Sequence, residues 1–137
     1  MKTIQNIGCF FLLSLVFLSC SNETDDKLDG KWQLQKVEIN GTAFDVDTIY
    51  YNFQTSLFMY QIYQPSSNSF KHCFGFKTVE DNKQLFLELT PYGSISIPAF
   101  LPYTDWSASK RNFSIEQLNN TRLVLKGDGK SYVFRKF

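Results

Sequence analysis

The sequence predicts an all-β fold, either a sandwich or a barrel. Short runs in which apolar and polar residues alternate are separated by turn residues at intervals of roughly 8–12 residues, the spacing of such folds. Aromatic residues, which favour strands, are abundant, with 14 Phe, 7 Tyr and 2 Trp among 137 residues. A chain of this length is expected to form one domain.

The charge of the chain is almost balanced. There are 14 basic and 13 acidic side chains, so bulk charge does not predict binding to nucleic acid or another polyanion. Charged residues make up 20% of the chain, which is typical of a globular protein rather than a disordered one.

Residues 1–19 have the features of an export signal. Lys2 gives a positive start, and residues 7–18 form an uncharged apolar run. This run has the length of a secretory signal core and falls short of the ~20 residues that cross a bilayer. We therefore expect a secretory signal peptide.

A short motif follows the apolar run. The segment Phe17-Leu18-Ser19-Cys20 resembles the lipobox of bacterial lipoproteins. The resemblance implies that Cys20 becomes the first residue and carries the lipid, and two or three acyl chains would anchor the protein stably in a membrane. The alternative is an ordinary cysteine near a cleavage site, in a position to pair with Cys73.

Residues 20–27 are polar and acidic, so we expect a flexible linker between the anchor and a domain at 28–137. The run also resembles the acidic segment that favours export to the outer surface in Bacteroidetes lipoproteins. A plain solvated spacer explains it equally well. From the lipobox and the resemblance to these lipoproteins, we expect the protein in the cell envelope, lipid-anchored to the outer membrane, facing either the periplasm or the cell surface.

The first strand after the linker predicts a β-bulge. Trp32 and Leu34 share one face, whereas Val37 and Ile39 fall on the other, so either the register shifts near residues 35–36 or both faces are covered there. A bulge is the simpler account. The Asn40-Gly41 pair then predicts a tight hairpin turn.

Further strands are predicted along the rest of the chain, with Leu85, Leu87 and Leu89 pointing inward. Their ranges are 42–46, 47–53, 57–63, 70–79, 84–90, 113–118, 121–126 and 131–137. Between them, three prolines in 91–110 exclude a central strand, although 94–97 could form a short edge. Four large side chains in this loop either cap the core or form a lid or contact patch: Phe100, Leu101, Tyr103 and Trp106.

The domain as a whole resembles a family. An opening Leu-x-Gly-x-Trp-x-Leu at 28–34 and a closing series at 113–134 look like the small lipocalin-like lipoproteins of Bacteroidetes. The resemblance implies a single antiparallel up-and-down β-barrel of about eight strands, which holds side chains or one small ligand. The loop at 91–110 and the lack of paired cysteines depart from the family.

Neither catalysis nor a cofactor is expected. His72 and Cys73 are adjacent on a predicted strand and therefore point to opposite faces, so they cannot form a catalytic pair. Since His72 is the single histidine and the sequence has no Cys-x-x-Cys, no zinc site is predicted.

One strand face offers a candidate binding site. Phe70, His72, Phe74 and Phe76 alternate along one strand and are expected to point into the barrel. His72 is then either a hydrogen-bonded interior histidine or a polar contact in a pocket. Two functions follow: binding of a small apolar ligand inside the barrel, or, with a filled core, contact of the loops with an envelope partner, a glycan or a foreign enzyme.

The lipobox resemblance generates the first testable prediction. Replacement Cys20→Ala should release the protein into the soluble fraction and abolish labelling with radioactive palmitate, because the modified thiol is lost. If the variant stays with membranes after a high-salt wash, Cys20 is not the anchor.

Overall fold

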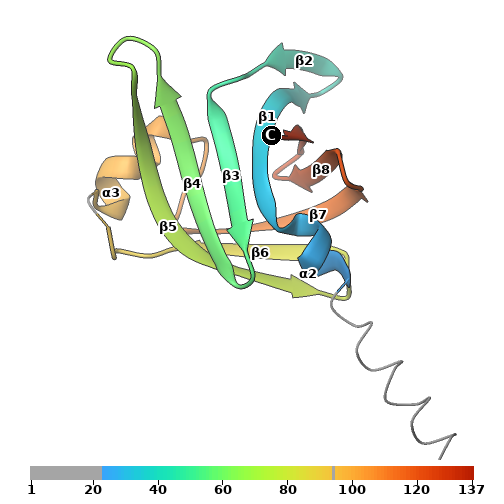
Figure 1. Cartoon of the computed structure of the whole chain (residues 1–137). Coiled ribbons are helices and arrows are strands. Elements are labelled where there is room, and N and C mark those ends of the chain that lie inside the picture. The colour runs from blue at the N-terminus through green and yellow to red at the C-terminus, as the bar shows by residue number, and fades with distance from the viewer. Residues whose placement is uncertain (1–22, 94) are drawn as a thin grey trace, which may run out of the picture.

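A computed structural model describes residues 23–93 and 95–137, which form a closed eight-stranded antiparallel barrel with one extra strand (Figure 1). The strand order is β2-β1-β3-β4-β5-β6-β7-β8-β9, and β1 also pairs with β9. The strands are β1 (Gly30–Ile39), β2 (Thr42–Asp45), β3 (Ile49–Gln54), β4 (Leu57–Gln64), β5 (Ser69–Glu80), β6 (Gln84–Leu89), β7 (Lys110–Leu118), β8 (Arg122–Gly127) and β9 (Lys130–Lys136). The predicted all-β barrel is confirmed.

Strand β1 closes the barrel. One of its edges pairs with β9 along its length, from Trp32 opposite Lys136 to Ile39 opposite Lys130. Its other edge pairs first with β3 and then, beyond residue 35, with β2. The register with β9 shifts between Leu34 and Lys36, so the predicted bulge is confirmed and lies where β1 changes partner.

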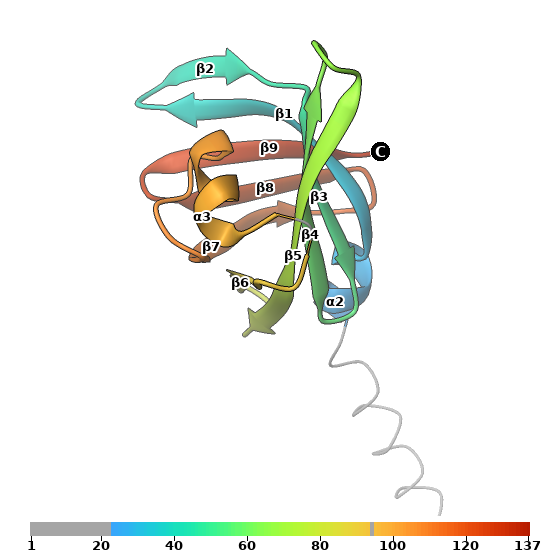
Figure 2. The ribbon, with the colours of Figure 1, turned by 90° about the vertical axis from the view of Figure 1, so that its left-hand side faces the viewer.

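The hairpin of β1 and β2 extends beyond the barrel, at the end opposite helix α2 (Glu23–Leu28) in both views (Figures 1 and 2). Its turn is the predicted one, with Asn40 and Gly41 at φ 51° and 79°, the left-handed region that a two-residue hairpin needs. Every residue of β2 is exposed, including Phe44.

The acidic stretch predicted to be a flexible linker contains a helix. Helix α2 (Glu23–Leu28) lies at one end of the barrel (Figure 1). Two contacts order it: Leu28 is fully buried and accepts a 2.7 Å hydrogen bond from Trp32 Nε1, and Asp25 pairs with the buried Lys77 at 3.0 Å. Within the described residues, no helix is long and apolar enough to cross a bilayer.

The loop between β6 and β7 also differs from the prediction. No edge strand forms from residues 95–97; instead Ile97–Phe100 is a short helix, α3, followed by the 3₁₀ helix η2 (Leu101–Tyr103). Ser96 caps α3 by accepting a hydrogen bond from the Ala99 amide, and Pro98 suits the first helical turn because its missing N–H needs no partner there.

Among the described residues, the core is mainly aromatic. Its buried members run from Leu28 to Phe134, and the predicted inward positions Leu85, Leu87 and Leu89 are all among them. Its largest fully buried side chains are Trp32, Tyr51, Tyr60, Phe58, Phe100, Phe113 and Phe134. Barrel closure and these core residues both lie within residues 28–136.

Truncation of Trp32 tests closure at β1. Trp32→Ala should lower the free energy of unfolding by about 3–5 kcal/mol, since a fully buried aromatic ring next to the β1–β9 seam is lost. The measurement is urea unfolding. Phe44→Ala, at an exposed position of β2, serves as the control and should cost less than about 0.5 kcal/mol. Equal effects of the two changes would contradict the closure.

Candidate functional site

The two cysteines singled out from the sequence, Cys20 and Cys73, differ in whether the structure describes them. Cys20 lies outside the residues that the structure describes. Cys73 is a buried free thiol on β5, and its burial raises its pKa. His72, its neighbour, is half-exposed on the outer side of the same strand, so the two side chains do face opposite ways.

The predicted orientation of β5 is wrong. Phe70, Phe74 and Phe76 are 46%, 44% and 50% exposed, and His72 lies on the same outer side, whereas Cys73 and Gly75 are buried. Phe70, His72, Phe74 and Phe76 therefore do not line the lumen. They form part of the outer surface of the barrel.

The reason for the inversion lies on the neighbouring strand and the loop. Across the β4–β5 pairing, Phe58 lies opposite Gly75 and Tyr60 opposite Cys73, so large inward side chains of β4 meet small ones of β5. Gly75 has no room for a side chain, because a Cβ would lie 2.2 Å from the backbone oxygen of Glu88. The inward side of β5 therefore carries small residues at these two positions, and the large residues of this strand point outward.

Side chains of the loop between β6 and β7 fill part of the barrel interior. Phe100 is fully buried and packs edge-on against Tyr60, with ring centroids 5.4 Å apart. Trp106 stacks on Phe58 at 6.1 Å and donates a 3.1 Å hydrogen bond to the Tyr51 hydroxyl. Of the four predicted contact residues, Phe100 and Trp106 thus cap the core from inside, Leu101 packs against it, and Tyr103 remains exposed.

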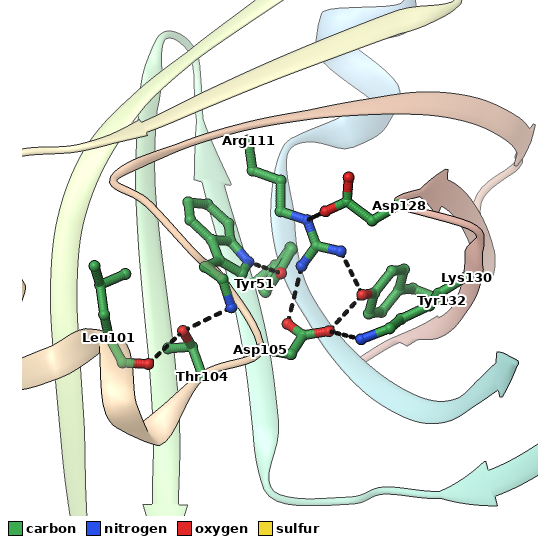
Figure 3. A network of polar contacts seen from close by, with 9 residues as sticks. Tyr51, Leu101, Thr104, Asp105, Arg111, Asp128, Lys130 and Tyr132 are labelled. Carbon is green, nitrogen blue, oxygen red and sulfur yellow. Dashed lines mark hydrogen bonds and ion pairs between the residues drawn. The ribbon is translucent and has the colours of Figure 1, made fainter.

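A polar cluster fastens this loop to the barrel wall (Figure 3). Arg111 of β7 is almost fully buried, and its Nη1 lies 2.9 Å from Asp105 Oδ1 in the loop. The hydroxyl of Tyr132 on β9 donates to Asp105 and accepts from Arg111. We call these three residues the clamp.

Two further charges complete the surroundings of the clamp. Lys130 Nζ lies 3.6 Å from Asp105, and Asp128 Oδ2 lies 3.3 Å from Arg111 Nε, within ion-pair range although outside hydrogen-bond geometry. Two cations thus face two carboxylates.

The clamp favours the charged guanidinium and the neutral phenol. Burial disfavours the charge on Arg111, but Asp105 and Tyr132 outweigh it and raise the pKa of the guanidinium. Burial, helped by Asp105, raises the pKa of Tyr132 far above its ordinary value. These shifts favour a charged Arg111 and a neutral Tyr132 near neutral pH, which suits a structural contact between the loop and the wall.

The candidate site is a groove on the outside of β3, β4 and β5. It has a volume of about 510 Å³ and a mainly apolar surface. Among its lining residues are Asp29, Asn52, Gln54, Leu57, Met59 and Phe74. We call it the β3–β5 groove.

The register of the sheet assembles this groove. Asn52, Met59 and Phe74 lie side by side across the three strands, and Gln54, Leu57 and Phe76 form the next row. Asn52 Nδ2 donates a 3.3 Å hydrogen bond to the Met59 carbonyl, which fixes the amide against the sheet; the carboxamide oxygen has no partner among the described residues. Apolar walls with a few fixed polar groups are the usual make-up of a small-molecule site.

Aromatic side chains continue the outer face beyond the groove. Phe70 packs against Tyr50 and Tyr63, and Tyr50 in turn contacts Phe137. Lys31 Nζ lies 4.5 Å from the Tyr50 ring centroid and 4.9 Å from that of Phe137, so its ammonium is held over rings. Exposed aromatic rings therefore cover much of this side of the barrel.

No cluster that could hold a metal ion occurs among residues 23–93 and 95–137. The groove itself was not predicted, although Phe74 was singled out, because its members come from three strands and meet only through their register. A sequence signal was present: β4 is apolar on both faces, and Leu57 and Met59 occupy the face that a barrel turns outward.

Comparisons with known proteins give consistent matches. A model of the lipocalin-like domain matches residues 13–137. A lipocalin-like protein from Bacteroides uniformis ATCC 8492 has a similar structure, with TM-score 0.71 and 28% identity over 81% of this chain and 99% of that one. An uncharacterized protein from Bacteroides eggerthii DSM 20697 gives TM-score 0.65 and 27% identity over 80% and 99%. No functionally curated protein matches the chain.

The clamp generates a stability prediction. Asp105→Ala should lower the free energy of unfolding by about 1.5–3 kcal/mol, because the buried Arg111 and Tyr132 lose a charged partner. Glu88→Ala removes the exposed pair with Lys110 and is the control, with an expected change below about 1 kcal/mol. Similar losses in both variants, measured by urea unfolding, would show that the clamp does not fasten the loop.

Proposed function

The chain belongs to the lipocalin-like domain family, and we propose that it is a lipid-anchored protein of the cell envelope that binds a small apolar ligand in the β3–β5 groove. The anchor is the lipid on Cys20. The apolar run of residues 7–18 and the Ser19-Cys20 pair support export and lipidation. The acidic residues after Cys20 are compatible with either orientation, towards the periplasm or towards the cell surface.

One observation carries the choice of the groove over the lumen. The inside of the barrel is occupied by the core and by Phe100 and Trp106, whereas the outer groove of about 510 Å³ is open. Its volume falls in the range of small-molecule sites, roughly 300–1,000 Å³. We therefore assign the predicted binding of a small apolar ligand to the outer wall instead of the lumen. Phe74 remains an aromatic contact for that ligand.

The chemistry of the groove favours an apolar ligand with one hydrogen-bonding end. Met59, Leu57 and Phe74 offer dispersion contacts and apolar area. Asn52 and Gln54 are uncharged, so they orient a neutral polar group without requiring charge neutralisation. We propose binding without catalysis, because no acid–base pair or nucleophile of the described residues lies in this groove.

A second candidate function is contact with an envelope partner, a glycan or a foreign enzyme through the loops. The exposed ring of Tyr103 supports it, since Lys71 Nζ lies 4.7 Å from the ring centroid at the rim of the barrel. The groove has the stronger support, because Leu57, Met59 and Phe74 place adjoining apolar side chains along β4 and β5, whereas Tyr103 is the one member of the predicted loop patch that is exposed.

Probe binding tests the proposal. The uncharged fluorescent probe N-phenylnaphthylamine should bind the wild-type barrel, and Phe74→Ala should weaken binding by roughly tenfold, the effect of losing about 1.4 kcal/mol of apolar contact. Phe44→Ala, equally exposed but on β2, is the matched control and should bind the probe as the wild type does.

Unfolding curves of the same variants separate affinity from stability. Because Phe74 is half exposed, its truncation should change the free energy of unfolding by less than about 1 kcal/mol. Absence of probe binding by the wild type, or equal binding by Phe74→Ala, would refute the groove as the site.

A further inference from the structure

We infer that the outer face of β3, β4 and β5 lies against the lipid bilayer in which the anchor sits. The inference rests on the proposed anchoring through Cys20 and adds the surface by which the barrel contacts the membrane. We define this face by four exposed or half-exposed residues, Leu57, Met59, Phe74 and Phe76, and call it the membrane face.

The first argument is where the chain enters the barrel. Helix α2 lies at the same end as the β3–β4 turn (Figure 1), and the Thr55 amide donates a 2.9 Å hydrogen bond to Asp29 Oδ1. Asp29 also lines the groove. The membrane face therefore begins next to the point at which the N-terminal segment reaches the fold.

The second argument is the length of that segment. Two residues separate Cys20 from Glu23, and the three peptide steps between them span at most about 11 Å when fully extended. Helix α2 adds about 9 Å for its six residues. A lipid on Cys20 thus holds this end of the barrel within roughly 20 Å of the bilayer surface, close enough for a side wall to touch it.

The third argument is the character of the wall. Leu57 and Phe76 are opposite each other across β4 and β5 and are about half exposed, at 51% and 50%. Phe74 and Met59 form the adjacent pair. Aromatic and aliphatic side chains with neutral amides beside them suit the headgroup boundary of a bilayer, where amphipathic rings concentrate.

The tether also makes a small apolar face sufficient. A patch of four side chains would bind a membrane only weakly from solution. Once the chain is anchored, contact of the face with lipid is an intramolecular step at high effective concentration. The structure thus combines a strong anchor with a weak, orienting contact.

Fluorescence quenching tests this contact. The lipidated protein is reconstituted in phosphatidylcholine vesicles whose acyl chains carry bromine, with tryptophan introduced by Phe74→Trp or, as matched control, by Phe44→Trp. Position 44 lies on β2, at the end opposite α2 (Figures 1 and 2), and is 52% exposed. Trp32 and Trp106 are buried and give the same background in both variants.

The expected result is a strong loss and blue shift of the emission of Phe74→Trp in brominated vesicles, with Phe44→Trp unchanged. Equal quenching of both, or quenching of neither in protein that floats with the vesicles, overturns the inference. A blue shift of Phe74→Trp without quenching also overturns it, since a second copy of the chain then covers the face.

The outcomes distinguish this inference from the proposed function. If the protein does not float with vesicles, anchoring fails and the membrane face fails with it. If Phe74→Trp is quenched while N-phenylnaphthylamine does not bind the wild type, the membrane face stands and the small-ligand site falls. If the probe binds and the quenching is absent, the small-ligand site stands and the membrane face falls.

Discussion

The burial of Phe100 and Trp106 inside the barrel is the constraint on which the rest of the structure depends. These side chains come from a loop rather than from the wall, and they occupy the space that a ligand would need. On β5, the inward positions opposite Phe58 and Tyr60 hold the small residues Gly75 and Cys73. The large residues of β5 point outward, so a filled lumen and an aromatic outer surface occur together.

The clamp explains how a loop with three prolines can hold a fixed place. Arg111 is buried at the rim, where an unpaired charge would be costly. Asp105 from the loop and Tyr132 from β9 satisfy it together, so the charge and the loop stabilise each other. The loop is thereby fastened to β7 and β9, and Phe100 and Trp106 belong to the core.

Sequence patterns predicted the strands well, because alternation and turn chemistry are local properties. The bulge near Gln35 and the Asn40-Gly41 turn were placed correctly for this reason. The direction of the β5 face was not, since hydrophobicity alone points Phe74 inward. The deciding facts were non-local: the pairing of Tyr60 with Cys73 and the arrival of Phe100 from a loop far along the chain.

The acidic stretch before the barrel shows the same limit of local sequence patterns in a polar segment. Its composition indicates a flexible segment. Leu28 is nevertheless buried, and Asp25 forms an ion pair with Lys77, a residue 52 positions away. A partner at that separation is not visible in a local window. The groove escaped prediction likewise, because Asn52, Met59 and Phe74 become neighbours only once two hairpins have formed.

The divided pairing of β1 has a mechanical consequence. Beyond Gln35, β1 leaves β3 and continues with β2, while the barrel stays closed through β1 and β9 and through β1 and β3. The link from β2 back to β3 is held by the hydrogen bonds from Val46 to Gln35 and from Tyr63 to Thr48. Strand β1 stays paired with β9 as far as Ile39, so β2 alone is an appendage, and its exposed residues can change in sequence without breaking the closed ring of hydrogen bonds. At the turn, a side chain added at Gly41 would meet no atom within 4 Å, but the φ of 79° favours glycine there.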